Sequence, residues 1–353
     1  MFTWANFFSQ VFNGLALGAL LALISSGLTI IYGTLGVLNL AHGAMFMMGG
    51  YAGYVVYDAT GSFTLAVAGG ALFMLVVGVV MERLIIRHFY HRPHEDQLLV
   101  TFGISIVMVE MVRLIFTSLS KTVPAPPLLS GITSLGFMVY PTYRLAVVGI
   151  VAVALLALFF LLYKTRLGMI VRAGIEDSTM VDSLGINVYR VFMIVFGIGS
   201  MAVGFAGIVN APVVSLTPDM GEAILVQTFV VVVIGGVGSF WGALVGGLIA
   251  GEIISLTAMV QPAYSEVMLF AAMAIVFTIS NRRVGTLKDG EVTKGIDAVN
   301  PKKQLLRSAA ATFEFMANGI ANEKKWTGPN GPMNYDGDLA KEDPLGSLLS
   351  LNL

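Results

Sequence analysis

Polar side chains that could carry chemistry are few in the first 281 residues, and most of them interrupt long apolar runs. Asn39 and His42 lie between two such runs, in a segment punctuated by glycine, residues 31–54. Inside a membrane, polar groups and backbone breaks of this kind are tolerated where protein or a water-filled cavity satisfies them. Asn39 and His42 therefore either line or hinge a path for a solute, or form hydrogen bonds between helices. The sequence favours neither interpretation.

Charged residues interrupt three further apolar runs: Glu110 and Arg113 in one, Glu252 in the second and Glu266 in the third. Glu110 and Arg113 are three residues apart, which places them on one face of a helix, and we interpret them as a structural ion pair. Glu252 stands alone in its run and is the better candidate for a group that lines a conduction path. A protonated, hydrogen-bonded structural glutamate would show the same pattern.

The sequence gives little support for a catalytic site or a metal site. Met45, Met47 and Met48 cluster, but neither a cysteine nor a second histidine accompanies them, so we interpret the cluster as packing and expect no metal site. A nucleophile, a base and metal ligands do not gather as they do in an enzyme, so we do not expect an enzyme.

Glycines at residues 235, 236 and 238 suggest a phosphate-binding loop. A Walker A loop requires a Lys-Ser or Lys-Thr pair after its glycines, and none follows these. The full Walker A pattern occurs nowhere in the chain. We therefore expect no ATP site of that type and no cofactor in this chain. Any ATP must be bound by another polypeptide.

The amino-acid composition indicates whether water or lipid surrounds the protein. Of the 353 residues, 56% are hydrophobic and 12% are charged, whereas soluble domains carry about 25% charged residues. One soluble core of this size could not hide that apolar surface, so we expect a membrane lipid environment. The net charge of −1 makes nucleic acid an unlikely partner. The first 13 residues hold no Lys or Arg, so we expect no cleavable signal peptide.

The apolar runs predict an all-α, polytopic membrane helix bundle, because a span needs about 20 apolar residues. We expect eight or nine crossings from nine hydrophobic segments. Two are short, 43–57 and 223–238, and one of these could be re-entrant or half of a broken helix. The segments are 11–31, 43–57, 63–86, 98–119, 143–163, 191–211, 223–238, 240–258 and 264–281. Glycines four apart, such as Gly14 with Gly18 and Gly247 with Gly251, mark helix contacts.

Basic residues predict the orientation, because cytoplasmic loops carry an excess of Lys and Arg. One set of loops holds ten of them and the opposite set holds two, Lys121 and Arg144. The first set should be cytoplasmic, and it includes residues 164–190, the longest charged interruption before residue 281. The ten are Arg83, Arg87, Arg92, Lys164, Arg166, Arg172, Arg190, Arg282, Arg283 and Lys288.

Residues 164–190 carry apolar side chains at helical spacing, and Gly185 is a plausible helix stop. The pattern predicts a short amphipathic helix in the cytoplasm. The alternative is a solvated loop that only joins two spans.

Three stretches together resemble the permease family of ATP-driven (ABC) importers for branched-chain amino acids. They are GVLNLAHGAMFMMGGY (36–51), KTRLGMIVRAGIEDSTMVDSLGIN (164–187) and VVVIGGVGSFWGALVGGLIAGEI (231–253). The resemblance covers about residues 10–285, and the spacing in the second stretch is its most specific part. It implies a transmembrane permease domain over 1–285, and leaves 286–353 as a cytoplasmic tail that includes an amphipathic helix at 304–320 and a mobile, turn-rich end.

The resemblance also implies partners and a mechanism. Residues 164–190 would form the coupling loop, whose helix docks on an ATPase subunit. The complex would hold a second, similar permease, two ATPases that bind ATP and Mg, and a soluble solute-binding protein, at the bacterial inner membrane. Closure of the ATPases would switch the path between its two openings. The implied ATPase-docking residues are Arg172, Ala173, Glu176, Asp177, Leu184, Gly185 and Ile186.

Two departures stand out: Val181 and Asp182 occupy positions where the family usually has small residues, and the tail after about residue 285 has no counterpart. The family also imports urea and amides, so the resemblance does not fix the cargo. A self-sufficient channel or ion-coupled carrier remains the alternative, with Glu252, Glu110 or His42 as its coupling group.

Overall fold

The computed structural model describes residues 4–90, 92–134, 136, 138–176 and 178–285, and the short pieces 327–328 and 331–332. The chain divides into two units, Met1–Val292 and Thr293–Leu353. In the second unit, β3 (Thr327–Gly328) pairs antiparallel with β4 (Gly331–Pro332). The amphipathic helix expected at 304–320 lies outside the described residues, as does the turn-rich end apart from β3 and β4.

All nine apolar segments are helical, which confirms the all-α, polytopic membrane fold. Six helices are long and apolar enough to span a membrane: α1 (Trp4–Leu35), α3 (Phe63–Leu84), α4 (His94–Phe116), α5 (Thr142–Lys164), α8 (Val188–Asn210) and α10 (Phe240–Val260). The other three are α2 (His42–Thr60), α9 (Met220–Gly235) and α11 (Ser265–Gly285). Of these, α9 and the stretch Pro262–Thr278 are apolar but shorter than a full span.

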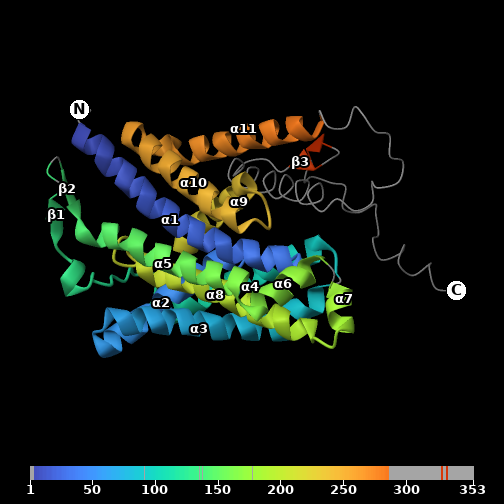
Figure 1. Cartoon of the computed structure of the whole chain (residues 1–353). Coiled ribbons are helices and arrows are strands. Elements are labelled where there is room, and N and C mark those ends of the chain that lie inside the picture. The colour runs from blue at the N-terminus through green and yellow to red at the C-terminus, as the bar shows by residue number, and fades with distance from the viewer. Residues whose placement is uncertain are drawn as a thin grey trace. The chain divides into compact units, whose positions relative to one another are not determined.

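Short elements cap the two ends of the bundle. The hairpin of β1 (Ile132–Ser134) and β2 (Val139–Pro141), which the sequence did not predict, lies at one end. Helices α6 (Arg166–Glu176) and α7 (Ser178–Ser183) lie at the opposite end (Figure 1). We call these the hairpin end and the α6–α7 end. Three 3-10 turns complete the first unit: η1 (Ile86–Phe89), η2 (Pro127–Leu129) and η3 (Pro262–Tyr264).

Two helices begin inside the bundle. After α1 ends, Gly36 adopts a positive φ of 68° and the chain turns back before α2 starts at His42. The His42 ring contacts the carbonyl of Ile24, which lies eleven residues, or roughly 17 Å, before the end of α1. Helix α9 begins at the same depth, because the backbone of Gly221 touches that of Gly43. Both short segments singled out in the sequence, 43–57 and 223–238, are thus helices that start at membrane depth.

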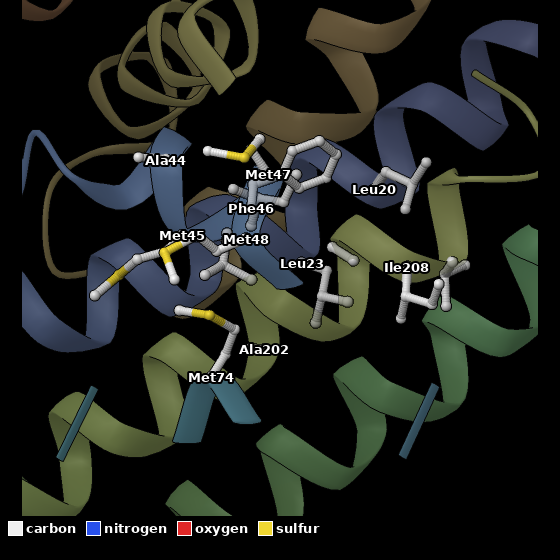
Figure 2. Packing of buried hydrophobic residues seen from close by; sticks show 14 of the residues in the cluster. Leu20, Leu23, Ala44, Met45, Phe46, Met47, Met48, Met74, Ala202 and Ile208 are labelled. Atoms are coloured by element: carbon white, nitrogen blue, oxygen red, sulfur yellow. The ribbon is translucent and has the colours of Figure 1, made fainter. Parts of the chain in front are cut away.

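The core surrounds α1, which is the most deeply buried of the six candidate spans. Leu23 of α1 packs beside Met45 and Phe46 of α2, with Met74 of α3 and Ala202 of α8 close by (Figure 2). The methionine cluster singled out in the sequence therefore lies in the hydrophobic core, where its flexible side chains fill the space between helices.

Glycine lets α1 and α10 touch along their backbones. A Cβ atom on Gly18 would lie 2.9 Å from the carbonyl oxygen of Gly247, a distance that real Cβ atoms do not reach. The predicted glycine pairs of α1 and α10 therefore lie in one interface, as close packing of helices in lipid requires.

This interface predicts the effect of a side chain at Gly18. Gly18→Val should force α1 and α10 apart and lower stability by about 1–3 kcal/mol, the usual cost of overpacking. Thermal unfolding in detergent measures the effect. Gly149→Val is the matched control, because that helical glycine of α5 has open space around it. Equal unfolding temperatures for the two variants would contradict the interface.

Candidate functional site

The break between α1 and α2 is satisfied by protein groups. The Asn39 side-chain oxygen accepts a hydrogen bond from the backbone N–H of Ala41 at 3.0 Å. The Thr101 hydroxyl of α4 accepts one from the N–H of Leu40 at 3.2 Å. Asn39 and Thr101 are fully buried. The irregular backbone at this depth is therefore held by side chains of its own segment and of α4, as burial in an apolar bundle demands.

His42 ties the start of α2 to the middle of α1. Its Nε2 lies 3.0 Å from the carbonyl oxygen of Ile24. A carbonyl only accepts, so Nε2 carries the proton. Nδ1 is buried and has no hydrogen-bond partner in the described part of the chain. The ring thus forms a hydrogen-bonded contact between α1 and α2, and Nδ1 could still accept a hydrogen bond from a solute or a water molecule.

Glu252 lies in a different place. Its carboxylate sits against Gly14, where a Cβ atom would come within 2.7 Å of Oε2. Gly14 and Ile24 are ten residues apart on α1, which is about 15 Å along the helix. The structure therefore brings Asn39 and His42 together at the break and does not bring Glu252 to them.

The α6–α7 end is anchored to the spans. Arg172 of α6 donates to the carbonyl of Leu162, in the last turn of α5, and its guanidinium lies over the Tyr163 ring at 5.3 Å. Val171 and Val181 are buried, and α6 also packs against α1 and α8. Burial of Val181 shows that one of the two departures from the family pattern faces the bundle, while Asp182 is exposed.

The outward side of this end carries exposed side chains. Ala173, Leu184 and Gly185 are exposed and Ile186 is half-buried, while the side chains of Glu176 and Asp177 lie outside the described residues. Gly185 has a φ of 81° and follows the end of α7, which confirms the predicted helix stop. The role of these residues in docking stays a prediction.

A buried carboxylate at the same end escaped the sequence analysis. Glu82, in the last turns of α3, is fully buried, and it accepts a hydrogen bond from the Tyr90 hydroxyl at 2.6 Å. Arg87 pairs with it at 3.3 Å and lies over the ring of Tyr189, at the start of α8. Burial and the bond to Glu82 raise the pKa of Tyr90, so its hydroxyl stays protonated and donates. The sequence signal that could have identified this site is a glutamate placed between an apolar run and an arginine, Arg83.

The predicted pair of Glu110 and Arg113 is confirmed, with an ion-pair distance of 2.5 Å. Arg113 also pairs with Asp219, directly before α9, which the sequence analysis missed. Among the described residues, no three His, Cys, Asp or Glu side chains gather as metal ligands would.

Comparison with known proteins adds the family. A family model described as "Branched-chain amino acid transport system / permease component" matches residues 10–277. This chain belongs to that family of permeases. High-affinity branched-chain amino acid transport system permease proteins LivH of Escherichia coli K12 and Salmonella typhimurium are 34% and 32% identical, each over 77% of this chain and 93% of the relative. BraD of Pseudomonas aeruginosa is 27% identical, over 82% and 98%. No solved structure matches the permease significantly.

Membership has direct consequences for the permease. It is a multi-pass membrane protein, and its relatives are transport subunits and not enzymes. The matched range, residues 10–277, contains the break, α6, α7 and both ion-pair clusters.

The cluster around Glu82 predicts a stability effect. Arg87→Met removes the cation and leaves a buried carboxylate. Losing one partner of a buried pair costs about 3–5 kcal/mol, and the 32% exposure of the Arg87 side chain reduces that cost. The double variant Glu82→Gln/Arg87→Met should unfold at a higher temperature than Arg87→Met alone, because no buried charge remains. If the two variants unfold together, the carboxylate is not charged in the folded protein.

The break predicts a transport effect. Asn39→Ala and His42→Ala should lower solute uptake while the permease still assembles, because the first frees the N–H of Ala41 at the turn and the second removes the bond between the start of α2 and the Ile24 carbonyl of α1. Uptake into proteoliposomes and size-exclusion profiles measure the two effects. Thr60→Ala is the control on α2, since its exposed hydroxyl bonds only to the carbonyl of Val56 and to the N–H of Ser62, at the surface turn and far from the break. Wild-type uptake in both variants would restrict Asn39 and His42 to a structural role.

Proposed function

We propose that this permease is the membrane-spanning subunit of an ATP-driven importer of branched-chain amino acids. The observation that carries the proposal is the α6–α7 segment. It is fixed to α1, α5 and α8 and presents exposed side chains outward, on a chain without a Walker A motif. Such a segment could transmit movement from a partner protein to the spans, while the chain has no Walker A motif to drive that movement itself. The names of the relatives support branched-chain amino acids as the cargo.

The anchoring of α6 suggests how a partner would act on the path. A force on α6 would reach the end of α5 through the bond of Arg172 to Leu162. It would also reach α1 and α8, which α6 contacts directly. Helix α1 carries Ile24, the residue that holds His42 and the start of α2. Movement of the docked segment would therefore displace the spans that frame the break, and the path would open to alternate sides in turn.

The partners follow from this division of labour. Two ATPase subunits would bind ATP and Mg and dock at the α6–α7 end through Arg172, Ala173, Leu184, Gly185 and Ile186, with Glu176 and Asp177. A second, similar permease would complete the path, and a soluble binding protein would deliver the solute at the hairpin end. The excess of basic residues supports a cytoplasmic α6–α7 end, and the bacterial relatives support the inner membrane of a bacterial cell as the location.

Replacement of the α6–α7 segment tests the proposal. Residues 172–185 exchanged for a Gly-Ser linker of equal length should abolish ATP-driven leucine uptake and co-purification of the ATPase, while membrane insertion survives. Leu72→Ala is the control, since Leu72 is an exposed apolar residue in the middle of α3, away from both ends of the bundle. Leucine accumulation by the purified chain, with no ATPase present, would favour the self-sufficient carrier instead.

A further inference from the structure

Three charged side chains gather on the flank of the bundle, away from the break and from the α6–α7 end. Arg113 of α4 pairs with Glu110 of the same helix and with Asp219 before α9. We call these three residues the charged triad. Their side chains are partly exposed, with 53% of Glu110, 37% of Arg113 and 60% of Asp219 accessible to solvent. Helix α4 is also the least buried of the six candidate spans, so the described part of the chain leaves the triad partly uncovered.

The triad lies well inside the length of the bundle. Asp219 directly precedes α9, whose Gly221 touches Gly43 in the first turn of α2. Phe116, one turn beyond Arg113, packs on Tyr51 with 4.9 Å between ring centroids. Tyr51 is nine residues, or about 14 Å, before the end of α2 at the hairpin end. The charges therefore sit at membrane depth and not at the rim.

Exposed charges at this depth cannot face hydrocarbon without a large cost, and ionisable groups inside membranes face a water-filled path or a bundle interior. The exposed part of the triad must therefore adjoin water or another subunit. A path completed by a second permease satisfies both conditions at once, because it would run along the surface of α4.

We propose that the charged triad lines the transport path and holds the charged ends of a zwitterionic solute, an inference that rests on the proposed function. Arg113 has five N–H donors in a planar fork and can accept a solute carboxylate beside its two partners. Asp219 and Glu110 then supply acceptors for an ammonium group. Glu222 is also exposed, one turn into α9, and adds negative charge on the same element.

The neighbourhood fits the rest of such a solute. Val107 and Leu114 of α4 are exposed and lie three and four residues from Glu110, on the same helix face. A zwitterion with a branched apolar side chain would place its charges on the triad and its hydrocarbon on these two residues. This pairing of charge and apolar surface is what distinguishes the triad from a surface ion pair.

Cysteine labelling tests the position of the triad. The chain has no cysteine, so Leu114→Cys, which keeps all three charges, and a control, Val76→Cys on the exposed apolar face of α3, carry one thiol each. In the complete importer in proteoliposomes, a charged methanethiosulfonate reagent should modify Leu114→Cys and leave Val76→Cys untouched. Leucine should slow the modification at least five-fold. Isopentylamine and 4-methylpentanoate, which each lack one charge, should not.

No modification of Leu114→Cys, or equal rates with and without leucine, would overturn the proposal. The wild-type importer serves as the reference for the proposed function. If it takes up leucine with ATP and Leu114→Cys fails the labelling test, only the triad site is wrong. If the wild-type importer takes up no leucine, the proposed function itself fails.

Charge exchange separates a ligand site from a simple latch between α4 and α9. In Arg113→Asp/Asp219→Arg the pair can form again with its ends reversed, so a latch would keep its function. A solute held in one orientation would meet the wrong charges, and leucine uptake should fall at least ten-fold. Glu266→Gln, an exposed carboxylate at the start of α11, is the control and should keep wild-type uptake. Restored uptake in the exchanged variant would overturn the site.

Discussion

Every backbone polar group inside an apolar bundle must find a partner within the protein, and the architecture of this permease depends on how residues 36–41 meet that demand. Asn39 and Thr101 accept hydrogen bonds from the N–H groups of Ala41 and Leu40, and His42 ties the start of α2 to the Ile24 carbonyl of α1. Because the turn is satisfied, α2 can begin at membrane depth, and glycine contacts let α9 begin beside it. Because two helices start at one depth, the middle of the bundle contains irregular backbone structure. A transporter needs such a region there, because its conformation must change during transport.

That central place is connected to the α6–α7 end by one helix. Ile24 of α1 holds His42, and the far end of α1 is touched by α6. The backbone contact of α1 with α10 makes the connection stiff, since neither helix can slide without a clash at Gly18 and Gly251. A stiff central helix transmits displacement, whereas a loosely packed helix would absorb it. The same glycines that pack the bundle thus also serve the proposed coupling.

Much of this could be predicted because it is local in sequence. Apolar runs located all nine helices, helical spacing with Gly185 located the segment that became α6 and α7, and a three-residue spacing located the pair of Glu110 and Arg113. What could not be predicted depends on residues far apart in the chain. Asp219 meets Arg113 across 106 positions, and the depth of the break depends on contacts of residues 38–42 with Ile24 and Thr101. Composition also cannot show that a stretch beginning at Met220 starts inside the bundle and not at its edge.

The two ion-pair clusters differ in a way that separates their roles. Glu82 is fully buried, and Arg87 and the Tyr90 hydroxyl occupy its oxygens, so it has no capacity left for a solute. It fixes α3 and η1 against the start of α8, at the end that we expect to dock the ATPase. The charged triad keeps more than half of each carboxylate side chain exposed, and its arginine bridges two helices that begin and end at different depths. Burial in the first cluster removes freedom to move, which suits an anchor. Exposure in the second preserves the ability to exchange partners, which a path that binds and releases a charged solute requires.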